Sequence, residues 1–376
     1  MWQKLRVVWQ SWDVLLLLFT LLLLVVGLAE LYSSSLSRPE LSPLFSRQLA
    51  AAALGLGAML LASLADYRLY RSWSKLIYVV AVALLVVVLV FGQTLRGTTG
   101  WLRWGEAGFQ PVELVKYLWV IALASYLAYV GSPLTAPKTV VTTVLLLPLL
   151  GLVLAQPDFG SGFLLLVVWA VLLGVVPKPR RWWVIMGGLV LVVGVIGSLF
   201  LRSYQQERLL TFFDPHRDPL GSGYNVTQSV VAVGSGGWWG RGLGLGTQSQ
   251  LKFLPEQHTD FVFASLAEEL GLVGSLLVLA LWVGWFSRVL KLIRRLRDDF
   301  AVLVAVGILS LFAVQVVLNI GMNLGVAPVV GITLPFVSYG GSSLIVSLAA
   351  VGILQNMMRQ YGWQAPAAEG RQRTRS

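Results

Sequence analysis

Long apolar runs separated by short polar breaks dominate this chain. Each run spans 17 or more residues, which is long enough for a helix to cross a hydrocarbon core about 30 Å thick. The pattern therefore predicts an all-α integral membrane protein with about ten transmembrane helices. They are expected near residues 12–31, 48–65, 74–92, 112–130, 139–155, 159–176, 182–202, 261–287, 301–325 and 334–358.

The first run, Val14 to Leu28, is similar to the apolar core of a signal peptide. No small-residue cleavage site follows it cleanly, and nine further runs come after it. We therefore expect a retained first helix.

One long polar interruption lies between the seventh and eighth predicted helices, at about residues 203–259. It contains the Gly-rich stretch from Gly234 to Gly246, interleaved with tryptophans and aliphatic residues. Because loops longer than about 15 residues are functional or disordered, and apolar residues argue against disorder, we expect a folded cap of short amphipathic helices. Residues 1–362 form the membrane domain, and the polar residues 363–376 are expected to be a disordered cytoplasmic tail.

Composition agrees with a membrane protein, since 57% of the residues are hydrophobic and 12% are charged. With the N-terminus inside, 18 of the 28 basic residues fall in inner segments, whereas the short outer loops hold only Arg38, Arg47, Arg96 and Arg103. The positive-inside rule then places both termini in the cytoplasm and the long loop outside. This bias explains the net charge of +11 without a nucleic-acid partner. The chain has no cysteine and two histidines, which excludes thiolate chemistry and a histidine-rich metal centre.

Ionisable groups at membrane depth are costly and are therefore functional candidates. Glu113 and Lys116 are three residues apart at the outer start of the fourth predicted helix, so they share one face. They are either a structural ion pair or part of a charged patch that lines a cavity.

Asp260 lies where the long loop becomes an apolar helix. Thr259 or Asp260 could cap that helix, or the carboxylate could act as a general base. Glu268 and Glu269 follow two turns later and are expected to face the protein interior.

Two further stretches have a structural and a functional interpretation. The Gly-rich stretch is either a tightly turning loop or a weak phosphate-binding motif, because it matches no standard nucleotide pattern. Residues 319–325, with 338–343, indicate either close helix packing through Gly321 and Gly325 or a broken helix that lines a pathway.

Five segments resemble signatures of the SEDS proteins (shape, elongation, division and sporulation), and they occur in the family's order. The long-loop segment from Phe253 to Asp260 is more similar to the RodA-like branch than to the FtsW-like branch. The segments are Phe109 to Lys116, Gln156 to Gly160, Asp214 to Asn225, Leu254 to Phe261, and Leu334 to Ser343.

The resemblance implies a peptidoglycan glycosyltransferase that polymerises lipid II during cell elongation, on the outer face of the bacterial cytoplasmic membrane. It implies a class B penicillin-binding protein as partner. The family's essential aspartate falls on Asp260, which would be the catalytic base. The residues expected to bind substrate are Trp101, Glu113, Lys116, Arg208, Glu256 and His258.

The leaving pyrophosphate requires positive charge, from Arg208, Lys116 or a divalent cation such as Mg²⁺ or Mn²⁺. The sequence departs from the family pattern at Gly100, Val112 and Gln156, where Arg, Ser and Lys are usual. Two alternative functions remain open, a lipid II transporter and a catalytically silent scaffold for cell-wall synthesis.

Overall fold

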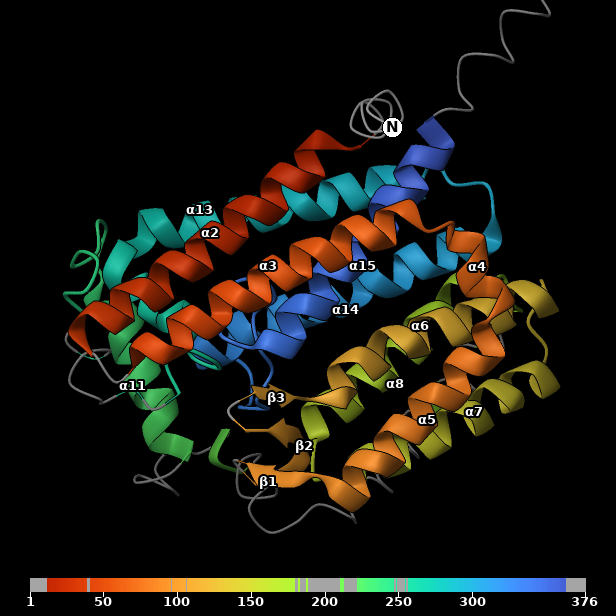
Figure 1. Ribbon diagram of the computed structural model, residues 1–376, viewed down its shortest axis with the longest axis horizontal. Helices are drawn as coiled ribbons and strands as arrows, with labels where there is room; N and C mark the ends of the chain where they lie inside the picture. The colour runs from red at the N-terminus through yellow and green to blue at the C-terminus, as the bar shows by residue number, and fades with distance from the viewer. Residues whose placement is uncertain are drawn as a thin grey trace, which may run out of the picture.

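The protein is an α-helical bundle with one small sheet (Figure 1). The computed structural model describes residues 12–38, 41–95, 97–105, 107–179, 222–246 and 256–362, with isolated positions between these ranges. The elements are α2 (Val14–Ser37), α3 (Ser42–Leu64), α4 (Tyr67–Ser72), α5 (Ser74–Phe91), β1 (Gln93–Leu95), β2 (Thr98–Trp104), β3 (Ala107–Phe109), α6 (Pro111–Val130), α7 (Ala136–Ala155), α8 (Phe159–Val175), α11 (Ser222–Ser235), α13 (Val262–Ile293), α14 (Asp299–Asn323) and α15 (Gly341–Gly362).

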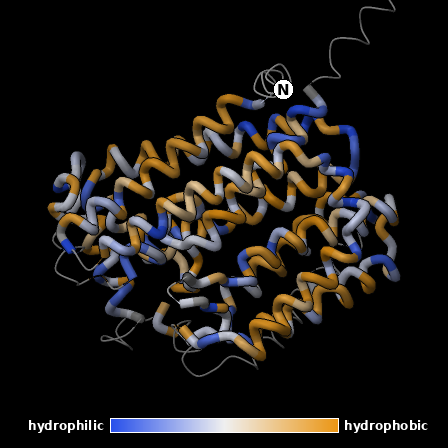
Figure 2. Tube along the Cα trace, in the orientation of Figure 1, coloured by the Kyte–Doolittle hydropathy of each residue, from blue (hydrophilic) through white to orange (hydrophobic). Residues whose placement is uncertain are grey.

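The multi-pass prediction is confirmed. Eight of the described helices, namely α2, α3, α5, α6, α7, α13, α14 and α15, are long and apolar enough to cross a membrane, and α8 is a shorter apolar helix. Each corresponds to one predicted span, and Figure 2 shows their apolar character along the bundle. The span expected at 182–202 lies almost entirely outside the described residues.

Two helix boundaries differ from the prediction. The last helix begins at Gly341 rather than near residue 334, because residues 334–340 form turns that hydrogen-bond to other segments. Helix α13 continues to Ile293 and contains a break at Gly271, whose φ of 67° is not helical. Hydropathy averaged over a whole span detects neither feature.

A three-stranded antiparallel sheet, which the helical prediction did not include, connects α5 to α6. Its strands are short, and pairing of Leu95 with Thr98 and of Trp104 with Ala107 leaves two-residue turns. Gly97 and Gly105 supply the positive φ that such turns require. Strands this short carry too little alternation to be detected by their period.

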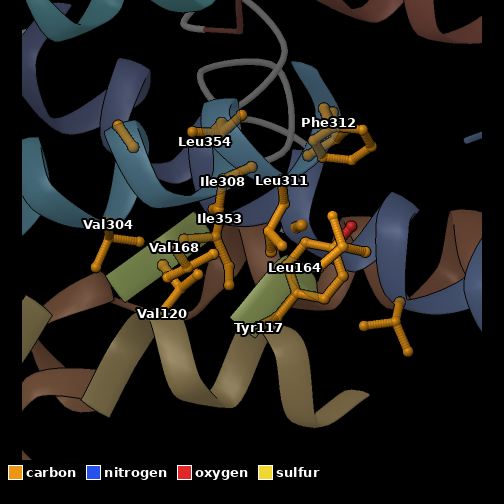
Figure 3. Packing of buried hydrophobic residues seen from close by; sticks show 14 of the residues in the cluster. Tyr117, Val120, Leu164, Val168, Val304, Ile308, Leu311, Phe312, Ile353 and Leu354 are labelled. Atoms are coloured by element: carbon orange, nitrogen blue, oxygen red, sulfur yellow. The ribbon is translucent and has the colours of Figure 1, made fainter. Parts of the chain in front are cut away.

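The core lies where α6, α8, α14 and α15 meet (Figure 3). Tyr117 and Val120 of α6 pack there with Ile308 and Phe312 of α14 and Leu354 of α15. Around this core, α3 packs along α15, and α2 packs along α13. The bundle formed by these helices has two ends, and different polar and charged residues lie at each end.

At one end, Arg288 of α13 forms an ion pair with Asp13, and Gln355 of α15 bonds to the same residue. At the opposite end lie the start of α13, the sheet, the starts of α6, α8 and α15, and α11 (Figure 1). We call this second end the Asp260 end. Helix α11 lies within the expected cap and is its principal described helix; most other positions between 180 and 255 are outside the described residues.

Candidate functional site

The segment that carries Asp260 is a tight turn, residues 256–261, held by the turns before α15. The Tyr339 amide donates to the His258 carbonyl (2.7 Å), and the Ser338 hydroxyl donates to the Thr259 carbonyl (2.6 Å). The rings of His258 and Tyr339 meet edge to face at 5.8 Å. The predicted last-helix signature therefore acts here as a clamp on the Asp260 segment.

Two buried asparagines at the end of α14 fix the backbone of Asp260. The side-chain amides of Asn319 and Asn323 both donate to the Asp260 carbonyl, at 3.0 Å each. Asn323 also accepts the Ala264 amide at 2.9 Å, so it caps the start of α13 from a neighbouring helix. Both side chains are fully buried, and buried amides with satisfied partners hold one geometry.

Helix α13 begins one to two residues later than a cap at Asp260 or Thr259 would place it. The N-cap of α13 is Phe261, which makes no side-chain cap bond. The Thr259 hydroxyl instead donates to the carbonyl and the carboxylate of Glu256.

Asp260 is a partly exposed residue at this end of the bundle. One of its oxygens lies 3.7 Å from the position that a Cβ on Gly331 would occupy. Glu256, which is also partly exposed, has φ of 54° and closes the turn by accepting the amides of Thr259, Asp260 and Phe261. A carboxylate on a turn fixed from three sides has the preorganisation that proton transfer requires.

Glu113 and Lys116 form the predicted ion pair, with 2.8 Å between the Lys116 Nζ and the Glu113 Oε1. Glu113 is 8% exposed and Lys116 is 2% exposed, so each buried charge depends on the other for its stabilisation. Asp158, the N-cap of α8, also interacts electrostatically with both charges of the pair. Burial raises the pKa of Asp158, while hydrogen bonds from Ser161 and the charge of Lys116 oppose that rise.

Residues 326–340 connect this ion pair to Asp260. Gly160, two residues after Asp158, packs against the Val330 carbonyl, where a Cβ would come within 2.6 Å. Gly331 follows and faces Asp260. The Gln110 amide at the start of α6 donates to Ser342 at 3.0 Å. The structure therefore brings Asp260, Glu113, Lys116, Glu256 and His258 to one end of the bundle.

Trp101 lies at the same end, on β2, and is partly buried against Gly108. The sheet is tied to Gln156, whose carbonyl accepts the Thr99 amide at 3.3 Å. Gln156, where the family usually has Lys, is buried and bonds to the Leu85 carbonyl. Arg208 lies outside the described residues, so its predicted role stays a prediction.

Glu268 and Glu269 face the interior as predicted and are almost fully buried. Glu269 accepts the Ser33 hydroxyl and the Gly244 amide, and Glu268 accepts the Gln248 amide. The Gly-rich stretch, through Gly244, and Gln248 after it thus direct backbone N–H groups at protein carboxylates. This arrangement favours the turning-loop interpretation over a phosphate site.

Among the described residues, no group of three or more His, Asp or Glu side chains is arranged to hold a metal ion. The same residues include three functional candidates that sequence reasoning missed: Asn319 and Asn323 as amide supports, and Asp158 beside the ion pair. Two signals in the sequence could have found them. Asn319 and Asn323 are two amides four residues apart in an apolar helix, and Asp158 is an acid directly before another apolar helix.

Comparisons with known proteins agree with this arrangement. Residues 9–362 match the family model FTSW_RODA_SPOVE, described as "Cell cycle protein". The chain is 39% identical to the peptidoglycan glycosyltransferase MrdB of Escherichia coli K12, over 92% of this chain and 93% of that protein. It is also 39% identical to the stage V sporulation protein E of Bacillus subtilis, over 92% of this chain and 97% of the relative.

A solved structure has the same fold. It comes from "Structural coordination of polymerization and crosslinking by a peptidoglycan synthase complex". One of its chains is 34% identical, with a TM-score of 0.79 over 93% of this chain and 98% of that one. The likeness extends over the whole membrane domain rather than over a single motif.

Proposed function

The chain belongs to the FtsW/RodA/SpoVE family and is a peptidoglycan glycosyltransferase, and on that premise we propose that it polymerises lipid II with Asp260 as general base. The observation that carries the proposal is the way Asp260 is held. Two asparagines, the turns before α15 and Glu256 fix its backbone, while the residue stays partly exposed. A carboxylate kept only for stability would not need to be both fixed and accessible.

In the proposed step, the Asp260 carboxylate removes the proton from an acceptor sugar hydroxyl. The oxygen of that hydroxyl attacks the anomeric carbon of the donor, and the bond to the lipid-linked pyrophosphate breaks. The pyrophosphate leaves with the bonding electrons, and the configuration at that carbon is inverted. A positioned base contributes about 10²–10⁴-fold to such a step.

The ion pair supports the site rather than taking the proton. The Lys116 charge is matched by Glu113 at 2.8 Å and is buried, so it is less suited to neutralise a leaving pyrophosphate at the surface. That role falls to Arg208 of the long loop in this proposal. No step of the proposal is assigned to a divalent cation.

The proposed orientation places the Asp260 end outside the cytoplasmic membrane and both termini in the cytoplasm. The basic residues of the inner segments support this, since Arg288, Arg294 and Arg295 lie at the opposite end of α13. A lipid-linked substrate in the outer leaflet would then meet Asp260 at the interface. A class B penicillin-binding protein is the proposed partner, in keeping with the synthase complex that shares this fold.

The direct test of polymerisation is reconstitution. Purified protein is incubated with lipid II, with and without the penicillin-binding protein, and glycan strands are separated on a gel. The proposal expects strands that depend on this chain and are lengthened by the partner. Movement of lipid II between leaflets of proteoliposomes, without any strands, would support a transporter and contradict the proposal.

A further inference from the structure

A Gly-rich turn, residues 236–246, closes the break in α13. A break at Gly271 frees backbone groups on both sides, and inside or beside a membrane such groups must find partners. The turn supplies them through four backbone hydrogen bonds. They run from Arg241 to the Glu268 carbonyl (3.0 Å), from Gly242 to the Glu269 carbonyl (3.0 Å), from Leu272 to the Gly237 carbonyl (2.9 Å) and from Val273 to the Trp238 carbonyl (3.2 Å).

Two features hold the turn at this level of the helix. The carboxyl group of Glu269 accepts the Gly244 amide at 3.1 Å, which adds a side-chain hydrogen bond. The backbones also approach very closely, because a Cβ on Gly240 would lie 2.1 Å from the Glu269 carbonyl oxygen. The turn is therefore docked on α13 in one register.

The side chains of the turn point away from the protein. Trp238 is 70% exposed and Trp239 is 81% exposed, and Leu243 and Leu245 are exposed as well. Four large apolar side chains on one short turn, with its polar backbone bonded to the helix, form an apolar tip. A contiguous exposed patch of this kind marks an interaction surface.

The apolar tip is continuous with the exposed face of a membrane-spanning helix. Leu272 and Val273, whose amides bond to the turn, have exposed side chains, as do Leu276 and Leu277 one turn further along. Helix α13 is a candidate membrane span, so these four exposed side chains are where a membrane would meet the helix. Tryptophan is enriched where a membrane meets water, because its ring is apolar and its N–H is polar.

We propose that the Gly-rich turn is an interfacial anchor that inserts Trp238 and Trp239 into the lipid interface at the Asp260 end. Arg241, between the tryptophans and the leucines, places a cation at headgroup level. The turn bonds to α13, which begins directly after the Asp260 segment, so an anchored turn restrains the height of that segment above the lipid. This inference does not depend on the reaction that Asp260 performs.

Because the chain has no cysteine, single labels test the anchor directly. A nitroxide is attached to Trp239→Cys in the full-length protein, in nanodiscs of phosphatidylcholine and phosphatidylglycerol. Collision rates are measured with oxygen, which concentrates in lipid, and with a water-soluble nickel chelate. Leu276→Cys on α13 is the lipid-facing control, and Arg103→Cys, exposed on β2, is the water-facing control.

We expect the oxygen-to-nickel collision ratio at position 239 to be several-fold above that at 103 and below that at 276. Leu243→Cys should give the same collision ratio from the other side of the turn. It replaces Trp239→Cys if the Trp239 variant does not purify as a single species. A ratio equal to that at 103 would show a tip in water and overturn the proposal. Shielding from both reagents would also overturn it, because protein rather than lipid would then cover the tip.

Discussion

At the residue scale, the geometry of Asp260 depends on amides that lie outside its own segment. Asn319 and Asn323 both donate to the Asp260 carbonyl, and leaving a buried acceptor without its donor costs about 1–3 kcal/mol. They are therefore positioning residues, which act on the reaction through the backbone of the base. The sequence shows their spacing but cannot show which carbonyl they reach.

We predict that Asn319→Ala lowers the polymerisation rate by at least about 10-fold, because a small displacement of the base is costly. The substrate concentration for half-maximal rate should change little, since Asn319 contacts no substrate in the proposed site. Gln315→Met is the matched control, one turn earlier on α14 and equally buried, with an unpartnered side-chain oxygen. Equal rates for the Asn319 variant and the wild-type protein would exclude the positioning role.

A second prediction at the residue scale concerns the stability that the ion pair of Glu113 and Lys116 gives to the fold. Glu113→Gln or Lys116→Met should each destabilise the fold by about 3–5 kcal/mol, because either change leaves one buried charge unpaired. The double variant should lose less than the sum of the two, since it leaves no unpaired charge. Thermal unfolding in detergent measures all three proteins. If Glu113→Gln leaves both stability and activity unchanged, the pair is solvated.

At the element scale, the break in α13 is the feature that the hydropathy pattern concealed. The 32-residue element α13 was predicted as one shorter span, because hydropathy averaged over the span gave no sign of a break at Gly271. The break matters because it gives the Gly-rich turn its docking position. Similarly, the last predicted span included residues 334–340, which instead form the clamp on the Asp260 segment.

We predict that Gly271→Ala detaches the turn from α13. A Cβ there would lie 2.2 Å from the Gly240 amide nitrogen, and φ of 67° is unfavourable for alanine. The melting temperature should fall by several degrees, and proteolysis within residues 236–255 should accelerate. Gly57→Ala on α3 is the control, because no atom lies within 4 Å of its added Cβ. An unchanged proteolysis pattern in Gly271→Ala would contradict the docking role.

At the scale of the whole molecule, the sequence was sufficient for the class of fold and the order of its helices. Apolar runs determine spans because the bilayer has a fixed thickness. The sequence also indicated which ionisable groups are functional candidates, because placing such a group at membrane depth is unfavourable in free energy. It could not predict the small sheet, whose strands are too short, nor the network of residues 326–340, because those contacts join segments far apart in the chain.

Orientation is a prediction for the whole molecule. Arg103→Cys at the Asp260 end should react with an impermeant maleimide in intact cells, and Arg295→Cys at the opposite end should react only after permeabilisation. The two variants make the same substitution at exposed positions, so the comparison is matched. The reverse labelling pattern would place Asp260 in the cytoplasm, away from a substrate in the outer leaflet.

The most direct measurement of the central claim is lipid II polymerisation by Asp260→Asn, purified with its partner at matched concentration. The account predicts normal yield and partner binding, with a rate at least about 10²-fold below wild type. Asp260→Glu should recover little of this rate, because the carboxylate moves by one methylene group. Asp299→Asn, which makes the same substitution at an exposed position at the opposite end of the bundle, is the control and should keep the activity. Robust glycan strands from Asp260→Asn would contradict the account and transfer the role of base to Glu256.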